Sequence, residues 1–263
     1  SDIRFVIGPN RKTIYAHRCI LAARCEVFKV MFSEQAASKD NHADVPFVMS
    51  DTTAEVFLPL LEYIYTNCVT LTQKNCIEVL GSSMEYGLEG LRQACINWLI
   101  ARISDATACE ILQAGVTYNQ DQLKDAAVQY IASNTAKVFQ SKGFNELSDT
   151  ALSYILKCNK LMMDEMEIVK HVTDWSTVNS VVLNKPVAQI AKRVNGLIRL
   201  PLLSPQELRN VEENNDNKLL AVDSFAYAWK CHALQSWDQH NPLTTLRTGT
   251  LPRDFYKAMK SST

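Results

Sequence analysis

Segments with the pattern of β-strands are confined to the first 71 residues of this 263-residue chain. The runs IRFVIG (3–8) and TIYAH (13–17) are rich in β-branched and aromatic residues, and the Gly-Pro-Asn turn signal after the first predicts a hairpin. VPFVMS (45–50) predicts another strand, and NCVTL (67–71) predicts one more short strand. Beyond residue 72 the apolar residues recur three and four apart, as they do on helices. Strands followed by helices predict an α+β unit and then an all-α unit.

The segment that follows the hairpin, residues 18–32, predicts one amphipathic helix. Its apolar residues recur at helical intervals, and the polar stretch after it, residues 33–44, predicts a loop. The helix carries more apolar side chains than one face needs, so one stripe is available to the core and another to a partner. The alternative, in which all of these side chains serve the core of a single chain, stays open.

Further helical segments follow, with Ser, Asp or Pro at their starts or Gly and Asn at their ends. The last stretch, residues 241–263, is less periodic and predicts a tail that lies on the body of the protein or is partly disordered. The helical segments are residues 53–66, 73–87, 88–103, 105–120, 121–140, 146–158, 164–178, 186–198, 204–215 and 223–237.

An acidic group marks the start of one of these helices. Asp164, Glu165 and Glu167 lie where negative charge interacts favourably with the N-terminal end of the helix dipole. We therefore expect a solvated helix cap at this position.

The composition excludes several classes of function. Lys plus Arg (27) nearly balance Asp plus Glu (28), which argues against nucleic-acid binding. No stretch is long and apolar enough to span a membrane, and the first residues lack the apolar region of a signal peptide. We therefore expect an intracellular protein, cytoplasmic, nuclear or both, that binds neither nucleic acid nor membrane.

The reactive side chains form no catalytic or metal-binding motif in the sequence. The 8 cysteines are scattered without a C-x-x-C pair, so we expect reduced thiols rather than a disulfide framework or a zinc site. Glycine-rich phosphate loops, the H-E-x-x-H helix and the G-x-S-x-G elbow are missing from the sequence. We therefore predict a protein that is not an enzyme and needs no cofactor and no metal.

Several phrases of the sequence resemble, in the right order, a BTB (POZ) domain over residues 1–102. They are DIRFVIG, YAHRCILAARCEVFKVMF, VMSDTTAEVFLPLLEYIYTNCVTL and SSMEYGLEGLRQACINWL. GFNELSDTALSYILKCNKLMMDEMEIVKHVTDW and IRLPLLSPQEL are similar to a BACK domain, which we expect over residues 103–240, with the tail at 241–263. The resemblance implies a small sheet with helices, followed by helical hairpins without kelch repeats. It also implies a role in protein–protein interaction.

The resemblance further implies that the chain forms a homodimer or a larger homo-oligomer through its BTB domain. The helix beginning near residue 18 takes part in that interface in the family, and Asp2 matches an acidic residue found just before the first strand. A carboxylate at an interface needs a cationic or hydrogen-bonding partner, which Arg18 or Arg24 is placed to supply. The predicted interface residues are Asp2, Arg18, Cys19, Leu21, Arg24, Cys25 and Phe28.

The commonest role that the resemblance implies is that of a substrate adaptor for cullin-3 ubiquitin ligases. Well-matched members carry a hydrophobic-x-Glu motif shortly after Met-Phe, where this chain has Ala36, Ala37 and Ser38. The missing apolar anchor and the missing carboxylate together weaken binding by roughly a hundredfold. The candidate cullin-facing residues are Phe32, Ala36, Ser38, Tyr63, Tyr65 and Asn67.

Three functions remain open from the sequence. The first is a self-associating, non-enzymatic BTB-BACK scaffold that binds another protein of unknown identity. The second is a cullin-3 substrate adaptor. The third is a BTB module that recruits a corepressor, which the neutral net charge and the missing DNA-binding domain make the weakest.

Overall fold

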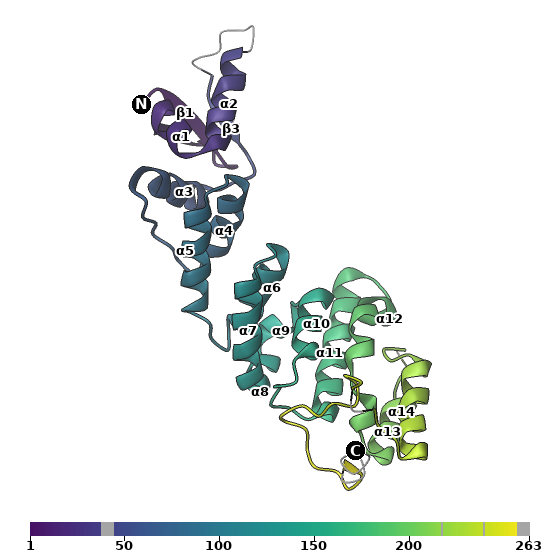
Figure 1. Ribbon diagram of the computed structural model, residues 1–263. Helices are drawn as coiled ribbons and strands as arrows, with labels where there is room; N and C mark the ends of the chain where they lie inside the picture. Colours follow the sequence, from purple (N-terminus) through teal and green to yellow (C-terminus); the bar gives the residue numbers. More distant parts are fainter. Residues whose placement is uncertain (38–44, 217, 239, 257–263) are drawn as a thin grey trace. The chain divides into compact units, whose positions relative to one another are not determined.

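A computed structural model describes residues 1–37, 45–216, 218–238 and 240–256. The chain divides into two compact units, Ser1–Arg102 and Ile103–Thr263, which we treat one at a time. The first unit contains three strands and five helices among its described residues, and the described part of the second unit is helical (Figure 1). The predicted α+β fold class, with a small sheet followed by helices, is confirmed.

The sheet of the first unit has the strand order β2-β1-β3. β1 (Ile3–Ile7) and β2 (Lys12–Ala16) form the predicted antiparallel hairpin, and Gly8 adopts a left-handed φ of 65° in its turn. β3 (Phe47–Met49) runs parallel to β1 on the other side. The side chain of Phe5, on the central strand, is fully buried.

The predicted single helix over residues 18–32 is wrong. The structure has two helices, α1 (Arg18–Arg24) and α2 (Glu26–Ala37), because Cys25 between them is extended, with φ −144° and ψ 116°. The Cys25 thiol is buried and donates a hydrogen bond to the Tyr86 carbonyl oxygen at 3.3 Å, a tertiary contact that local spacing does not reveal. α2 also continues through residues 33–37, where we predicted a loop, and the rest of that loop lies outside the described residues.

Three more helices complete the first unit: α3 (Ala54–Thr66), α4 (Cys76–Glu85) and α5 (Glu89–Ile100). Aromatic rings of the sheet and the helices meet in the core, with the Phe5 and Phe57 ring centroids 5.1 Å apart. The short strand predicted at residues 67–71 is wrong, because this segment begins at the left-handed Asn67 and pairs with no strand of the described chain. Its backbone is instead held by the Glu62 carboxylate, which accepts hydrogen bonds from both the N–H and the hydroxyl of Thr70 at 2.9 Å.

The second unit is a succession of helices, with α6 and α7 packed as a hairpin. Two predicted helices are broken. The one over 121–140 is interrupted at Asn134, and the one over 186–198 becomes α12 followed by 3₁₀ turns. The helices are α6 (Ala108–Thr117), α7 (Asp121–Ser133), α8 (Thr135–Phe139), α9 (Lys142–Asn145), α10 (Asp149–Lys157), α11 (Glu165–Leu183), α12 (Val187–Ile190), α13 (Pro205–Glu213) and α14 (Val222–Leu234). The 3₁₀ turns are η1 (Ala191–Arg193), η2 (Asn195–Leu197) and η3 (Leu200–Leu202).

Residues 247–256, which we name the C-terminal strap, dock on the second unit at the start of α11 (Figure 1, yellow). The side chains of Arg247 and Glu165 are both fully buried, and Arg247 Nε donates to Glu165 Oε2 at 2.9 Å. The predicted solvated cap is therefore wrong for Asp164 and Glu165, which are buried under the strap, whereas Glu167 is exposed. The sequence does not reveal this, because the arginines that cover the carboxylates follow them by more than 80 positions.

A second arginine of the strap joins two carboxylates. The guanidinium of Arg253 contacts Asp164 at 2.9 Å and Glu207 at 2.8 Å. Burial alone raises the pKa of the Asp164 carboxyl, but the hydrogen bonds from Arg253 and from backbone N–H groups outweigh burial and hold that pKa below its ordinary value. The strap is thus an ordered part of the second unit.

Candidate protein-interaction surfaces

The structure divides the predicted dimer-interface residues between the core and the surface. Leu21, Cys25 and Phe28 are at most 4% exposed. These three residues pack within their own chain and offer a partner almost no surface, and their place in a dimer interface stays a prediction. Part of the apolar surplus of the segment 18–32 thus serves the core, whereas Val30 of the same segment is 47% exposed.

The other predicted interface residues lie near the two ends of α1. Asp2 and Cys19 are exposed and Arg18 is half-buried near its start, and Arg24 is exposed at its last position. The carboxylate of Asp2 accepts a hydrogen bond from the backbone N–H of Arg18 at 2.8 Å, and this bond lowers the pKa of Asp2. The guanidinium of Arg18 donates to Gln35 Oε1 at 2.6 Å, and that of Arg24 donates to Asn67 Oδ1 at 2.7 Å. Arg18 is therefore the partner of Asp2, mainly through its backbone N–H and to a smaller extent through its charge.

The candidate cullin-facing residues are also divided. Phe32 is buried in the core, and Tyr63 is half-buried with its hydroxyl against Gly90. Ser38 lies outside the described residues. The exposed members are Ala36 in the last turns of α2, Tyr65 near the end of α3, and Asn67 in the left-handed cap that ends α3.

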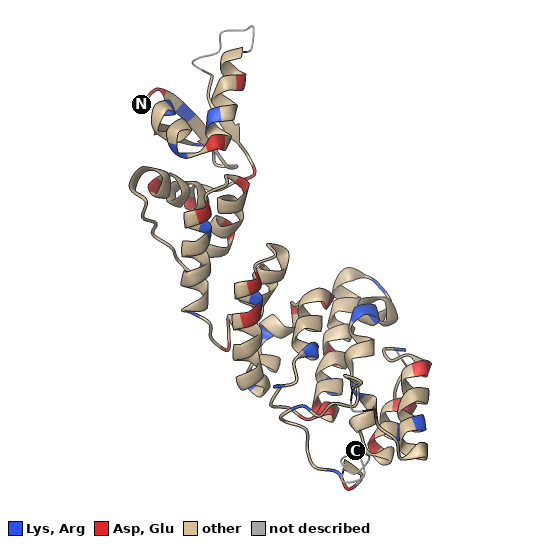
Figure 2. Cartoon of the chain, in the orientation of Figure 1, with Lys and Arg blue, Asp and Glu red and all other residues tan. Residues whose placement is uncertain are grey.

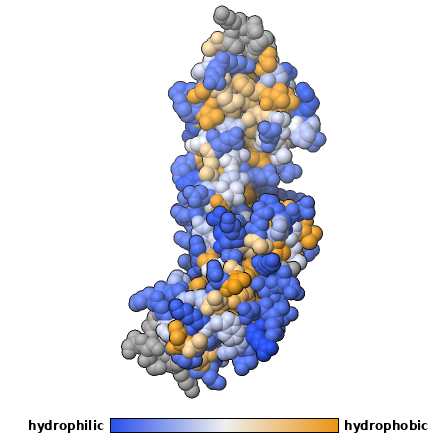
Figure 3. All heavy atoms as spheres, turned by 90° about the vertical axis from the view of Figure 1, so that its right-hand side faces the viewer, coloured by the Kyte–Doolittle hydropathy of each residue, from blue (hydrophilic) through white to orange (hydrophobic). Residues whose placement is uncertain are grey.

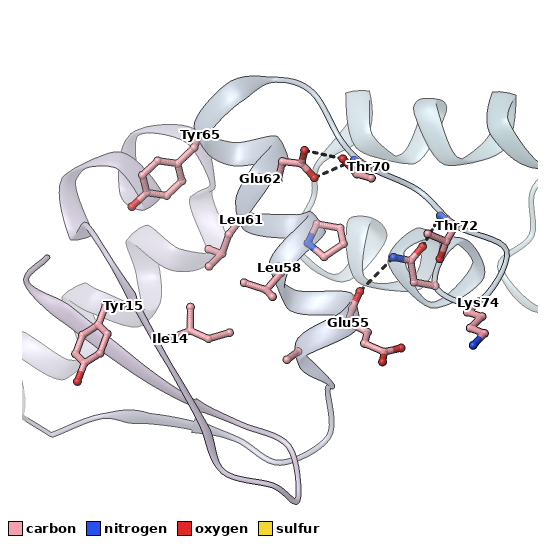
Figure 4. A pocket seen from close by; sticks show the side chains of 13 residues that line it. Ile14, Tyr15, Glu55, Leu58, Leu61, Glu62, Tyr65, Thr70, Thr72 and Lys74 are labelled. Carbon is pink, nitrogen blue, oxygen red and sulfur yellow. Dashed lines mark hydrogen bonds between the residues drawn. The ribbon is translucent and has the colours of Figure 1, made fainter.

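An apolar groove between β2 and α3 was not predicted from the sequence. Its volume is about 740 Å³, and Figure 4 shows Ile14 of β2 facing Leu58 and Leu61 of α3 across it, with the Tyr15 ring at its edge and turned away from the leucines. Tyr15, Leu58 and Tyr65 are 63%, 42% and 41% exposed, which is unusual for large apolar side chains grouped together. Two features of the local pattern pointed toward this groove. Tyr15 occupies an outward position on an edge strand, and Leu58 lies outside the buried stripe of α3.

Polar contacts fix the walls of this groove. The hydroxyl of Tyr65 accepts a hydrogen bond from the backbone N–H of His17 at 2.8 Å, which ties the end of α3 to the start of α1. On the other wall, the amide of Asn75 donates to the Glu55 carbonyl oxygen at 3.3 Å (Figure 4). The groove is thus held open by hydrogen bonds rather than formed by loose side chains.

Tyr15 joins the groove to the surface around α1. Besides lining the groove, it lines a second hollow together with Asp2, Arg4 and Arg18. The two hollows therefore meet at one exposed aromatic ring. Aromatic rings in such positions are common anchors of protein–protein contacts.

Metal-ligating groups, charge and apolar side chains were compared over the two units. No group of three or more metal-ligating side chains occurs within the residues that the structure describes. Positive and negative side chains are intermixed over each unit (Figure 2), and hydrophobic side chains reach the face drawn in Figure 3 in small groups. None of the described helices is long and apolar enough to cross a membrane.

Comparison with known proteins agrees with this organisation. The family model of the BTB/POZ domain matches residues 1–103, and that of the domain described as BTB And C-terminal Kelch (BACK) matches residues 108–213. BTB/POZ domain-containing protein 19 of Bos taurus is 39% identical over 259 residues, which are 98% of this chain and 88% of that protein. The protein of the same name from Homo sapiens is 38% identical, covering 100% of this chain and 90% of its own.

A longer relative matches over a smaller share of its length. BTB/POZ domain-containing protein 9 of Homo sapiens is 30% identical over 233 residues, 88% of this chain and 36% of that protein. The chain thus carries a BTB/POZ domain followed by a BACK domain, and it shares most of its length with BTB/POZ domain-containing protein 19. The chain belongs to the BTB-BACK family and is similar over its whole length to BTB/POZ domain-containing protein 19.

Proposed function

We propose that this chain is a non-enzymatic adaptor that self-associates through the surface of its first unit around Tyr15. The observation that carries the proposal is the 63% exposure of Tyr15 between the groove and the hollow of Asp2 and Arg18. A second copy that covers this ring removes apolar surface from water and brings polar groups to Asp2 and Arg18 at its rim. The second unit then presents its own surfaces to another protein.

Replacing Tyr15 with glutamate is expected to convert a dimer into a monomer. Burial of a tyrosine contributes about 2–3 kcal/mol, so its loss raises the dissociation constant of the dimer by roughly a hundredfold, and the buried charge adds to the effect. The measurement is the mass of the full chain in solution by light scattering. Tyr15 points outward on an edge strand, so we expect the variant to stay folded, which circular dichroism checks.

Val48→Glu is the matched control for this experiment. Val48 is also 63% exposed and also lies on an edge strand, but on the opposite edge of the sheet. We expect this variant to keep the dimer mass. A folded Tyr15→Glu chain with the mass of the native dimer would show that the self-association surface lies elsewhere.

The second candidate function is that of a cullin-3 substrate adaptor, and the exposure of Ala36, Tyr65 and Asn67 favours it. Alanine at position 36 offers little apolar surface, so we expect no binding of the cullin-3 N-terminal domain by the native chain at roughly 10 μM. Ala36→Leu restores an apolar anchor and is expected to raise the affinity about tenfold. Calorimetric titration of the full chain tests both statements. Tight binding by the native chain would make the adaptor role in a ligase the primary one.

A further inference from the structure

The C-terminal end of α11 exposes a group of apolar side chains. Val178, Val181, Val182 and Leu183 are 42%, 79%, 72% and 53% exposed. The other large exposed apolar side chains in the described part of the second unit are separated along the chain: Tyr154, Met162, Val222, Leu234, Leu246 and Leu251. The end of α11 is therefore the place in this unit where such side chains follow one another closely.

The helix continues at this end beyond its buried residues, and the Asn179 amide donates to the Asn145 carbonyl oxygen at 2.9 Å. The last buried residue of α11 is Ser176, so residues 177–183 extend it by about 10 Å beyond its packed part. The end is nonetheless ordered, because Asn184 adopts a left-handed cap and the backbone N–H of Lys185 donates to the Ser180 carbonyl oxygen at 3.1 Å. Valine is a poor helix former, so exposed valines are costly unless another surface covers them.

The charges at the two ends of this apolar stripe are opposite. Asp174 precedes Val178 by one turn, and Lys185 follows Val181 by four residues. Asp174 and Lys185 are exposed, and neither side chain has a hydrogen-bond or ion-pair partner among the residues that the structure describes. The spacing of 174, 178 and 181 is that of a helix-packing seam, and Lys185 lies just beyond the left-handed cap at Asn184 that ends the helix.

We infer that the end of α11 is a second self-association contact, in which the helices of two copies pack antiparallel about a two-fold axis. In this arrangement Val178 of one copy faces Val181 of the other, the two-fold axis lies between the two such pairs, and Val182 flanks them. The same register brings Asp174 of each copy opposite Lys185 of its partner. A parallel arrangement places like charges together, so the order of charge along the stripe selects the antiparallel one.

This contact is small and acts together with the contact of the first unit, so the inference about assembly rests on the proposed function. Four side chains per copy bury well below the roughly 800 Å² per partner of a stable interface. We therefore expect association at about 100 μM, above the concentration at which the first unit pairs. Two different two-fold contacts on one chain link dimers into tetramers and longer rows or rings.

Sedimentation velocity of the full chain between about 1 μM and about 300 μM tests the contact. The native chain is expected to pass from dimers to larger species, and Val182→Glu is expected to stop at dimers, with the second association at least about tenfold weaker. Val222→Glu is the control, because Val222 is 80% exposed on α14 and lies outside the stripe. We expect this control to behave as the native chain.

A charge exchange tests the antiparallel register. Asp174→Lys alone and Lys185→Asp alone each place like charges opposite one another, and each is expected to weaken the second association about fivefold to tenfold. The double variant Asp174→Lys, Lys185→Asp restores opposite charges and is expected to recover the native association. If both single changes weaken association and the double change does not recover it, the antiparallel pairing is overturned.

The outcomes separate this contact from that of the first unit. If the native chain is a monomer at low concentration and forms dimers that Val182→Glu removes, the Tyr15 surface fails and the α11 contact stands. If native and Val182→Glu chains have the same mass distribution over the whole range, the α11 contact is overturned, and the stripe is left as a surface for a different protein.

Discussion

Replacement of Arg247 by methionine is expected to lower the free energy of unfolding of the second unit by about 3–5 kcal/mol. The side chain donates to Glu165 Oε2 at 2.9 Å and to the carbonyl oxygens of Leu156 and Cys158 at 2.6 and 2.9 Å. Methionine fills most of the volume but donates nothing, so the buried carboxylate loses its charged partner. Thermal and urea unfolding of the full chain, followed by tryptophan fluorescence, measure the loss.

Arg209→Met is the control for this prediction. Arg209 pairs with Glu213 at 2.7 Å, but both side chains are more than half exposed, so solvent screens the pair. We expect a change of about 0.5 kcal/mol or less. Equal losses of unfolding free energy in the Arg247→Met and Arg209→Met variants would mean that the buried Arg247–Glu165 pair does not stabilise the strap.

Gly249→Ala is expected to displace the strap. A Cβ atom at this position lies 2.0 Å from the backbone nitrogen of Met163 and 2.3 Å from the carbonyl carbon of Met162. Backbone atoms cannot turn aside as a side-chain end does, so the hydrogen bond from the Gly249 N–H to the Leu161 oxygen, 2.8 Å in the native chain, is lost. The expected cost is about 3 kcal/mol, with faster hydrogen exchange and proteolysis at residues 247–256.

Gly196→Ala is the matched glycine control. An added Cβ at Gly196 meets nothing within 4 Å, and the residue lies in the same unit. We expect this variant to change stability by less than about 1 kcal/mol and to leave exchange at residues 247–256 unchanged. If hydrogen exchange at residues 247–256 is unchanged in both glycine variants, the strap tolerates a side chain at position 249.

Local pattern was sufficient to predict the hairpin and the order of sheet and helices, because these depend on side chains that alternate or recur within a few residues. The break at Cys25 was not predictable in this way. It depends on a thiol that reaches the Tyr86 carbonyl oxygen 61 positions along the chain. The buried state of Glu165 depends on Arg247, which follows it by 82 positions in a segment without helical periodicity.

The interaction surfaces were predictable in part. Asp2 and Arg18 were identified from the resemblance, and the structure places both at the edge of one hollow. Leu21, Cys25 and Phe28 were assigned to the interface because the sequence of an apolar helix does not reveal which of its faces packs against the core. The structure shows that these three side chains lie on the core face. The groove could be found only in the structure. Tyr15 and Leu58 lie 43 positions apart, and the hydrophobic pattern of the sequence does not show that their strand and helix are neighbours.

The strap also affects the order of events during synthesis. Its contacts join residues separated by up to 91 positions, from Leu156 and Asp164 to Arg247 and Arg253. A ribosome releases the amino-terminal residues first, so the first unit can fold while the second is still being made. Glu165 remains without its arginine until residue 247 has emerged. The second unit therefore completes its fold only after residue 253 has left the ribosome.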